Sequence, residues 1–400
     1  MAEILITGMG IVSALGNNTD ETLAALQAQK SGIAPLRYLQ TAHTEFPVGE
    51  VKMTNEEMIS LLKLPEYEPT TRTSLMGMLA VKEALKSANL DYQSKKIAFI
   101  NGTTVGGMDK SEQFYLDFIE NDTKNAYIST HDCGACTEMI ADYFGIFSQV
   151  DTISTACSSA ANAILLGAEL LKSGRADIVV AGGSECITKF HLNGFNTLMI
   201  LDKEPCRPFD ATRAGLNLGE GAAYVVMERK GVLNTPSLCK LSGYANTCDA
   251  FHQTASSPNG EGAYLAMKKA LEDANLQPQD IDYINAHGTG TGNNDVSEGT
   301  AIVRLFGENI PPVSSTKSFT GHTTSAAGCV ESVISILALQ HNFIPVNLNF
   351  SVQMPELPFA PAMNQQPTKP LQHILSNSFG FGGNDTSLIF SRLNHDFVQN

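Results

Sequence analysis

One cysteine of the chain combines a nucleophilic side chain with a setting that could activate it. Cys157 stands in the stretch Thr-Ala-Cys-Ser-Ser, directly before a helical pattern rich in Ala, Leu and Ile that runs from Ser158 to Ser173. Unpaired N–H groups and the macrodipole at a helix N-terminus favour negative charge, so we expect a lowered thiol pKa for Cys157. The same N–H groups could stabilise an oxyanion. An unreactive cysteine in a buried helix explains this stretch equally well.

Two histidines and a lysine lie in glycine-bearing turns far from Cys157 in the sequence. His287 follows a predicted strand at residues 281–284, within Asn-Ala-His-Gly-Thr-Gly-Thr. Lys317 and His322 share the stretch Ser-Ser-Thr-Lys-Ser-Phe-Thr-Gly-His, which precedes a predicted helix of small residues at 325–339. Glycine lets a backbone approach a ligand closely. Each residue alone is typical of an ordinary turn, but together they favour a shared cleft.

A glycine-rich stretch near the C-terminus, residues 376–385, reads Ser-Asn-Ser-Phe-Gly-Phe-Gly-Gly-Asn-Asp. Its glycines could let Phe381 move or let the backbone approach a substrate. A tight bend whose phenylalanines fill the core is the alternative, and composition does not separate the two.

Short β-rich runs alternate with Ala/Leu-rich helical patterns, which indicates an α/β fold. A weak internal duplication accompanies this alternation, because residues 79–90 (LAVKEALKSANL) and 265–276 (LAMKKALEDANL) share eight of twelve positions. We expect two related halves that meet near residue 240: residues 1–240 with Cys157, and residues 241–400 with His287, Lys317 and His322. A site between the halves would collect these distant turns. The predicted strands lie at 4–7, 96–100, 178–180, 281–284 and 387–390.

The composition excludes several classes of function. Of the 400 residues, 43% are hydrophobic and 17% charged, and the formal net charge of −15 argues against a nucleic-acid binder. No uncharged run approaches the ~20 residues that cross a bilayer, and no leader-like start is present, so we expect a cytoplasmic protein without membrane insertion. The eight cysteines are scattered, and reduced thiols are the expectation.

In combination these motifs resemble the β-ketoacyl-[acyl-carrier-protein] synthases of the thiolase-like superfamily, closest to the elongating type II enzymes. The resemblance implies a thiolase-like α/β fold with two pseudo-duplicated halves in αβαβα layers. It implies decarboxylative Claisen condensation of an acyl chain on Cys157 with malonyl-carrier protein, in fatty-acid or specialised polyene or polyketide synthesis. The stretches that carry it are 4–16, 155–159, 181–185, 207–210, 219–222, 285–291, 314–322 and 376–383.

The resemblance also assigns a role to each candidate residue. His287 and His322 would hydrogen-bond the malonyl thioester carbonyl, and backbone N–H groups of Cys157 and Phe381 would form the oxyanion hole. Phe381 would gate access, and Lys317 would orient the site and tune the histidines. The remaining implied positions are Glu331, as a supporting acidic residue or a lone charge on a helix face, and Val105, in the acyl pocket.

The implied partners are an acyl carrier protein and a second subunit, either an identical chain or a homologous synthase. No metal or dissociable cofactor is implied, because the substrates arrive on the phosphopantetheine of the carrier. Residues 198–201 are apolar where the family often carries a carrier-binding arginine, and Asn384-Asp385 replaces the usual Thr-Asn. The candidate basic contacts are Lys63, Arg72, Lys189 and Arg207.

Three alternatives remain open. Cys133 and Cys136 form a Cys-x-x-Cys pair that could mean metal or redox chemistry, although one such pair is weak evidence. The start of the chain resembles a strand entering a dinucleotide loop, but Ser13 stands where the third glycine belongs. The third alternative is a non-catalytic chain-length partner of a second synthase. Such partners usually lack the nucleophilic cysteine that this chain keeps.

Overall fold

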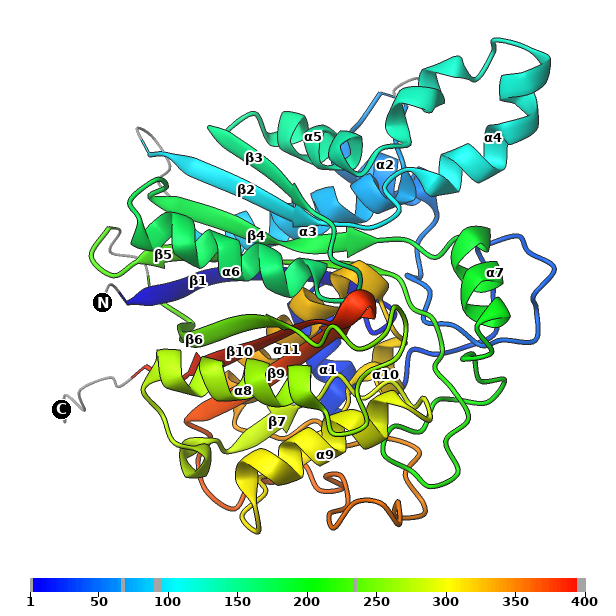
Figure 1. Cartoon of the computed structure of the whole chain (residues 1–400). Helices are drawn as coiled ribbons and strands as arrows, with labels where there is room; N and C mark the ends of the chain where they lie inside the picture. The colour runs from blue at the N-terminus through cyan, green and yellow to red at the C-terminus, as the bar shows by residue number, and fades with distance from the viewer. Residues whose placement is uncertain (1–2, 66–68, 90–94, 233–235, 394–400) are drawn as a thin grey trace.

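The computed structural model describes residues 3–65, 69–89, 95–232 and 236–393. Its described strands form one ten-stranded mixed sheet in the order β3-β2-β4-β5-β1-β6-β10-β9-β7-β8. Figure 1 shows this order from β3 at the top to β7 near the bottom. The strands are β1 (Ile4–Ser13), β2 (Ile97–Gly102), β3 (Gln149–Ile153), β4 (Ile178–Glu185), β5 (Gly221–Arg229), β6 (Cys239–Cys248), β7 (Tyr283–Asn285), β8 (Val313–Ser314), β9 (His373–Gly380) and β10 (Asn384–Ser391).

The sheet repeats one pattern of strand pairing twice. In the N-terminal half β1 pairs antiparallel with β5 and β5 with β4, whereas β4, β2 and β3 are parallel neighbours. The C-terminal half has the same order, with β6, β10, β9, β7 and β8 in the equivalent places. The predicted duplication is therefore confirmed. The boundary at residue 240 falls within β6 and stays a prediction.

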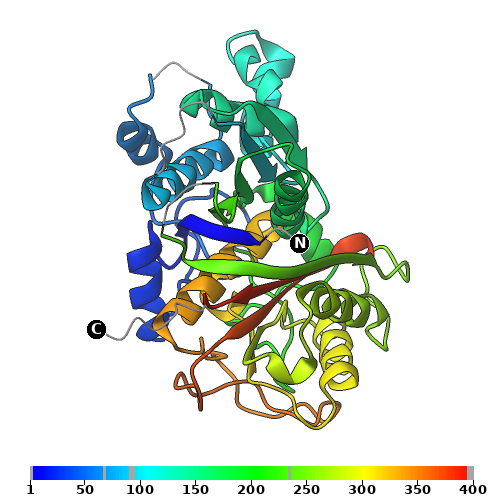
Figure 2. The same cartoon turned by 90° about the vertical axis from the view of Figure 1, so that its left-hand side faces the viewer.

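The two half-sheets join through a short antiparallel contact between β1 and β6, from the pair Ile4 and Leu241 to the pair Ile6 and Cys239. Figure 2 shows these strands side by side across the middle of the molecule. The ten described strands therefore form one continuous sheet. The β1–β6 hydrogen bonds satisfy backbone groups that two separate edges would leave unpaired.

Four helices build the layers that the resemblance implies. Helix α3 (Arg72–Ala88) packs on β1 and β5, and α8 (Glu261–Ala274) packs on β6 and β10, so they cover the outer faces. They contain most of the repeated sequence, whose position Leu90 lies outside the described residues. Helices α6 (Ser159–Lys172) and α11 (Ala327–His341) contact each other and strands of both halves, and form the middle layer.

Helix α11 is buried nearly all around. Every residue from Ala327 to Leu339 is buried, which is typical of a helix enclosed on all sides. Glu331 is the one acidic residue of this helix, so it needs an internal partner. The predicted bounds 325–339 and 158–173 agree with α11 and α6 to within two residues, and Ser158 and Ser173 are the caps of α6.

The segment from α4 (Met108–Glu120) to the 3-10 helix η1 (Asn125–Thr130) stands out from the body at the upper right of Figure 1. No residue of α4 is buried. Described helices that complete the fold are α1 (Thr19–Gln27), α2 (Asn55–Leu62), α5 (Cys133–Phe144), α7 (Lys189–Thr197), α9 (Asn294–Phe306) and α10 (Lys317–Thr320), with 3-10 helices η2 (Pro278–Asp280), η3 (Thr324–Ala326) and η4 (Phe381–Gly383). Among the described helices, none has the length and apolar character to cross a membrane.

Candidate active site

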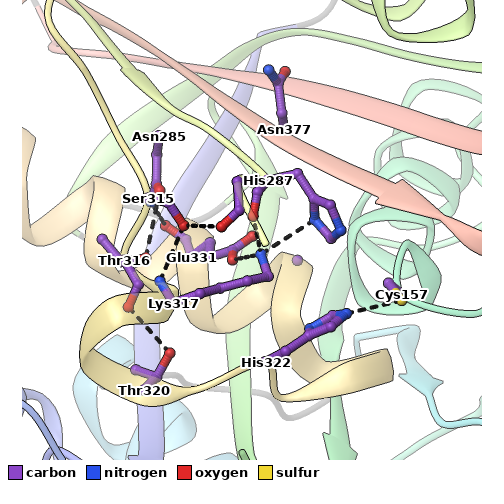
Figure 3. A network of polar contacts seen from close by, with 12 residues as sticks. Cys157, Asn285, His287, Ser315, Thr316, Lys317, Thr320, His322, Glu331 and Asn377 are labelled. Atoms are coloured by element: carbon purple, nitrogen blue, oxygen red, sulfur yellow. Dashed lines mark hydrogen bonds and ion pairs between the residues drawn. The ribbon is translucent and has the colours of Figure 1, made fainter. Parts of the chain in front are cut away.

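Cys157, His287 and His322 come together from three turns, as the sequence predicts (Figure 3). The Sγ atom of Cys157 lies 3.1 Å from Nε2 of His322, and the two imidazole rings are 5.3 Å apart in an edge-to-face arrangement. One donor atom from each of the three side chains lies within 4.8 Å of the others, and all three residues are buried. The predicted shared cleft is therefore present.

The backbone around Cys157 is bent so that the thiol faces this cleft. Ala156 has a φ of +52°, a left-handed conformation that is uncommon for a residue with a side chain. Backbone N–H groups of Phe381 and of Cys157 itself face the sulfur. A side chain at Gly380 would place its Cβ only 3.3 Å from the nitrogen of Cys157, so this close approach favours glycine. Two N–H groups thus converge near the nucleophile.

The expectation of a lowered thiol pKa is wrong. Burial raises the pKa of Cys157 to about 11, although Lys317 and the N–H groups of Phe381 and Cys157 oppose the shift. The free-energy cost of removing water from the thiolate is larger here than the stabilisation by the nearby positive charge and backbone dipoles. The thiol is therefore protonated at neutral pH, and His322 is the proton acceptor within reach.

His287 is held from two sides. Its backbone N–H donates to Glu298 of α9 at 2.9 Å, and the next N–H, of Gly288, donates to the same carboxylate at 2.7 Å. The Nζ atom of Lys317 donates to the carbonyl of His287 at 2.6 Å and lies 3.2 Å from its Nδ1. An ammonium group that donates to Nδ1 leaves the imidazole proton on Nε2. His287 therefore presents an N–H donor.

Lys317 and Glu331 form a buried ion pair, each side chain 2% exposed. Burial raises the pKa of Glu331 to about 7, and the contact with Lys317 opposes this shift. The alternative of Glu331 as a lone charge on a helix face is thus contradicted. The ammonium group also gives the cleft a positive charge next to both imidazoles.

His322 is positioned by the N-terminal half. Its N–H donates to the carbonyl of Asn217 at 2.7 Å, and its carbonyl accepts from Gly219 at 2.9 Å. Burial, followed by the charge of Lys317, holds the pKa values of His322 and His287 well below the usual range. Both imidazoles are therefore neutral at physiological pH, and each carries one N–H donor.

A cavity of about 130 Å³ opens onto these three side chains. Phe381 lines it, as the sequence predicts, and stacks on Phe195 of α7 with ring centroids 5.9 Å apart. Sequence reasoning missed both Phe195 and Glu298. The polar residues of the lining are Thr254, Ser256, Thr289, Thr291, Asn293 and Asn294.

Other candidates lie away from this cavity. Val105 is buried and does not line it, so its place in an acyl pocket stays a prediction. Burial raises the pKa values of the Cys133 and Cys136 thiols, and in the described part of the chain neither belongs to a set of three donors that could hold a metal. The set that does is Cys157, His287 and His322 itself, where the ammonium group of Lys317 opposes a cation.

Arg72 is wrong as a contact for a carrier protein. Its guanidinium is 11% exposed and pairs with the buried carboxylate of Glu220 at 2.6 Å. Its remaining N–H groups donate to Met53, Asn55 and Val51. Arg207 is paired with Asp202 at 2.9 Å, whereas Lys63 and Lys189 are exposed and stay candidates.

Two family descriptions match the chain: "Beta-ketoacyl synthase, N-terminal domain" over residues 1–231 and "Beta-ketoacyl synthase, C-terminal domain" over residues 238–351. The 3-oxoacyl-[acyl-carrier-protein] synthase 2 of Coxiella burnetii is 32% identical, with 98% of each chain covered. Nodulation protein E of Rhizobium meliloti is 31% identical over 98% of this chain and 99% of its own. A Xenorhabdus doucetiae ketosynthase, solved with its chain length factor, has a TM-score of 0.87 and 31% identity over 98% of both chains. The chain belongs to the beta-ketoacyl synthase family.

Proposed function

We propose that the chain is an elongating-type condensing enzyme in which Cys157 carries the acyl chain and His287 and His322 act on the malonyl thioester. The observation that carries this proposal is the 3.1 Å contact between the Cys157 thiol and His322, with the Nε2–H of His287 facing the same cavity. A non-catalytic chain-length partner needs neither the thiol nor the Lys317 network behind it.

In the first step Cys157 attacks the thioester of an acyl carrier protein. The thiol proton passes to Nε2 of His322, the new S–acyl bond forms, and the carrier's phosphopantetheine sulfur leaves. That sulfur takes the proton from His322, which returns to its neutral form. The low pKa of the imidazolium favours this return. The N–H groups of Cys157 and Phe381 stabilise the oxyanion that forms on the thioester carbonyl.

In the second step malonyl-carrier protein occupies the cavity that the first carrier has left. Breaking the bond to the carboxylate releases CO₂ and leaves the electron pair as a thioester enolate. The Nε2–H of His287 donates to the enolate oxygen. His322 supplies a second donor once it has exchanged its Nδ1 proton with solvent for one on Nε2, the nitrogen that faces Cys157, and Lys317 stabilises the negative charge. Neutral histidines suit this task, since neither changes its charge when the enolate forms.

In the third step the enolate carbon attacks the acyl-Cys157 carbonyl. A carbon–carbon bond forms, the thioester to Cys157 breaks, and the 3-oxoacyl group stays on the carrier. The released thiolate takes up a proton from solvent, which the high thiol pKa favours. Over the full cycle the acyl chain moves from one carrier to Cys157 and then onto the malonyl-derived unit, which stays bound to the phosphopantetheine sulfur of the second carrier.

The partners follow from this chemistry. The enzyme would receive both substrates from an acyl carrier protein in the cytoplasm, without a dissociable cofactor. A second subunit is supported by exposed structure at the N-terminal half: β3 is an edge strand, and apolar side chains of the α4–η1 segment are exposed. We propose a dimer, either of identical chains or with a homologous chain-length partner. The exposed side chains are Tyr115, Leu116, Ile119 and Ile128.

Intact-protein mass spectrometry tests the proposed nucleophile. Incubation with an acyl-carrier protein should add the mass of one acyl group, and peptide mapping should place it on Cys157. The mass would also identify the preferred chain. An adduct on another residue, or none with acyl groups of any length, would sink the proposal.

A further inference from the structure

A buried carboxyl group that the proposed mechanism does not use lies directly behind the Phe381 turn. Asp385 is the second residue of β10 and is 4% exposed. It stands between Phe379 of β9 and Thr247 of β6 in the sheet register. Within the described ranges no hydrogen-bond donor reaches its carboxyl oxygens. This residue replaces the asparagine that the sequence motif leads one to expect.

Acidic groups surround Asp385 on the elements packed against it. Burial raises the pKa of Asp385 to about 8, and the charges of Asp249, just after β6, and of Glu298 in α9 add to this shift. Gly262 of α8 lies between the two aspartates, since a Cβ there would be 2.1 Å from Oδ2 of Asp385 and 2.7 Å from Cβ of Asp249. At the start of the same helix Glu261 pairs outward with Arg304.

Asp249 connects this cluster to the turn. Its carboxylate accepts the N–H and the hydroxyl of Ser257, both at 2.7 Å, and its own N–H donates to the carbonyl of Gly383 at 2.8 Å. The N–H of Gly382 donates to Gln253 of the same segment at 2.7 Å. A displacement of Asp249 would therefore pull on both glycines that follow Phe381.

We propose that Asp385 is a positioning residue: uncharged, it lets segment 249–257 hold the Phe381 turn in the cavity, and ionised, it repels Asp249 and Glu298 and loosens the turn. Access to Cys157 then depends on the protonation of a residue that touches no substrate. The inference rests on the proposed function only in that Phe381, which lines the cavity beside Cys157, controls access to that thiol.

The direction of the pH effect follows from the charges. Below pH 8 the group is protonated and the turn is held, whereas above pH 8 it ionises next to two carboxylates. Asp385→Asn is a matched variant, because asparagine has nearly the same shape and stays uncharged at every pH. It should keep the turn held throughout.

The absence of tryptophan from the sequence allows a direct test. Phe381→Trp introduces a single tryptophan that reports on the turn by its emission. Between pH 6 and pH 10 we expect an emission change with a midpoint near pH 8, which Phe381→Trp combined with Asp385→Asn removes. Cys157 and Glu331 titrate in both proteins, so the difference isolates Asp385. Identical pH responses in the two proteins would overturn the proposal.

Amide hydrogen exchange provides a second measurement without the tryptophan. After correction for the intrinsic pH dependence, protection of residues 380–383 and 249–257 should fall about tenfold in the wild-type chain between pH 6.5 and pH 9. Asp385→Asn should show no such fall, and equal behaviour of the two chains contradicts the proposal. Neither the emission nor the exchange measurement needs turnover. A protein that shows this pH response but no condensation would therefore refute the condensing function and leave the proposal for Asp385 intact.

Discussion

The two halves share one fold but contribute different chemistry at equivalent places. The connection after β3 leads to the N-terminus of α6 and carries the neutral thiol of Cys157. The equivalent connection after β8 leads to α11 and carries Lys317 and His322. The half with the nucleophile supplies the thiol and the N–H of Cys157, whereas the other supplies the N–H of Phe381 and most of the titratable groups that surround the sulfur. The duplicated fold therefore brings the two connections together, and the residues that differ between these connections determine the chemistry.

In each half a buried glutamate accepts from the turn after the second strand. Glu185 at the end of β4 accepts from Thr103 at 2.9 Å, the N–H of Thr104 at 2.6 Å and the hydroxyl of Ser325 at 2.6 Å. Glu298 does the same for His287 and Gly288. The difference is that Glu298 holds a catalytic imidazole, and Glu185 holds a turn with no titratable side chain.

The largest effect should come from removing the nucleophile. Cys157→Ala should lower acylation and condensation by at least ~10⁴-fold, because no other thiol lies in the cavity. The C-terminal half should remain able to decarboxylate malonyl-carrier protein, measured as CO₂ release. Condensation at the normal rate by this variant would refute the division of labour between the halves.

Breaking the buried ion pair should come next. Lys317→Ala leaves Glu331 buried without its partner, so we expect a loss of about 3–5 kcal/mol in the free energy of unfolding, measured with denaturant. CO₂ release should fall by about 10²-fold or more. Lys317→Met with Glu331→Gln is the control: it should regain much of the stability but not the activity. Recovery of both would show that the charge is only structural.

Matched substitutions of Glu298 and Glu185 test whether the two carboxylates differ in function. Glu298→Gln and Glu185→Gln each leave a donor without an acceptor, which costs about 1–3 kcal/mol of stability by thermal unfolding. CO₂ release should fall about 10–100-fold in Glu298→Gln, because His287 moves, and only a fewfold in Glu185→Gln. Equal loss of CO₂ release in both variants would contradict the assignment of decarboxylation to the C-terminal half.

The smallest effect concerns the pH dependence of the thiol. With a pKa of about 11, Cys157 is protonated below that pH. In Asp385→Asn, where the Phe381 turn stays held, its alkylation by iodoacetamide should therefore accelerate about tenfold per pH unit between pH 7 and pH 10. Lys317 lowers this pKa, and Lys317→Met should therefore slow alkylation about fivefold at fixed pH. A plateau of the Asp385→Asn rate near neutral pH would show that the thiol is already ionised there.

The residues that the sequence could predict lie in motifs at the ends of strands and helices. Cys157, His287, Lys317, His322 and Phe381 all reach one cavity or the network behind it, because the turns that carry them meet between the halves. The strand–helix alternation and the repeated helix were sufficient for the fold class. The continuity of the sheet was not predictable, because it depends on three pairs of residues in β1 and β6.

Burial and long-range partners account for what the sequence could not predict. The thiol pKa depends on how deeply Cys157 is enclosed, which a helix-terminus argument does not include. Arg72 was wrong as a docking residue because its partner, Glu220, is 148 positions away. Glu298 was missed because α9 looks like an ordinary amphipathic helix. The sequence signal that could have identified it is the position of Glu298 on the same helix face as the apolar residues Ala301 and Ile302.

The most direct test of the account separates the two half-reactions in His287→Ala. Acyl transfer to Cys157, followed by mass spectrometry, and CO₂ release from malonyl-carrier protein are measured on the same preparation. We expect an acyl adduct formed within about tenfold of the wild-type rate, and CO₂ release lowered by about 10²–10³-fold. Unchanged CO₂ release, or equal loss of both activities in a folded protein, would contradict it.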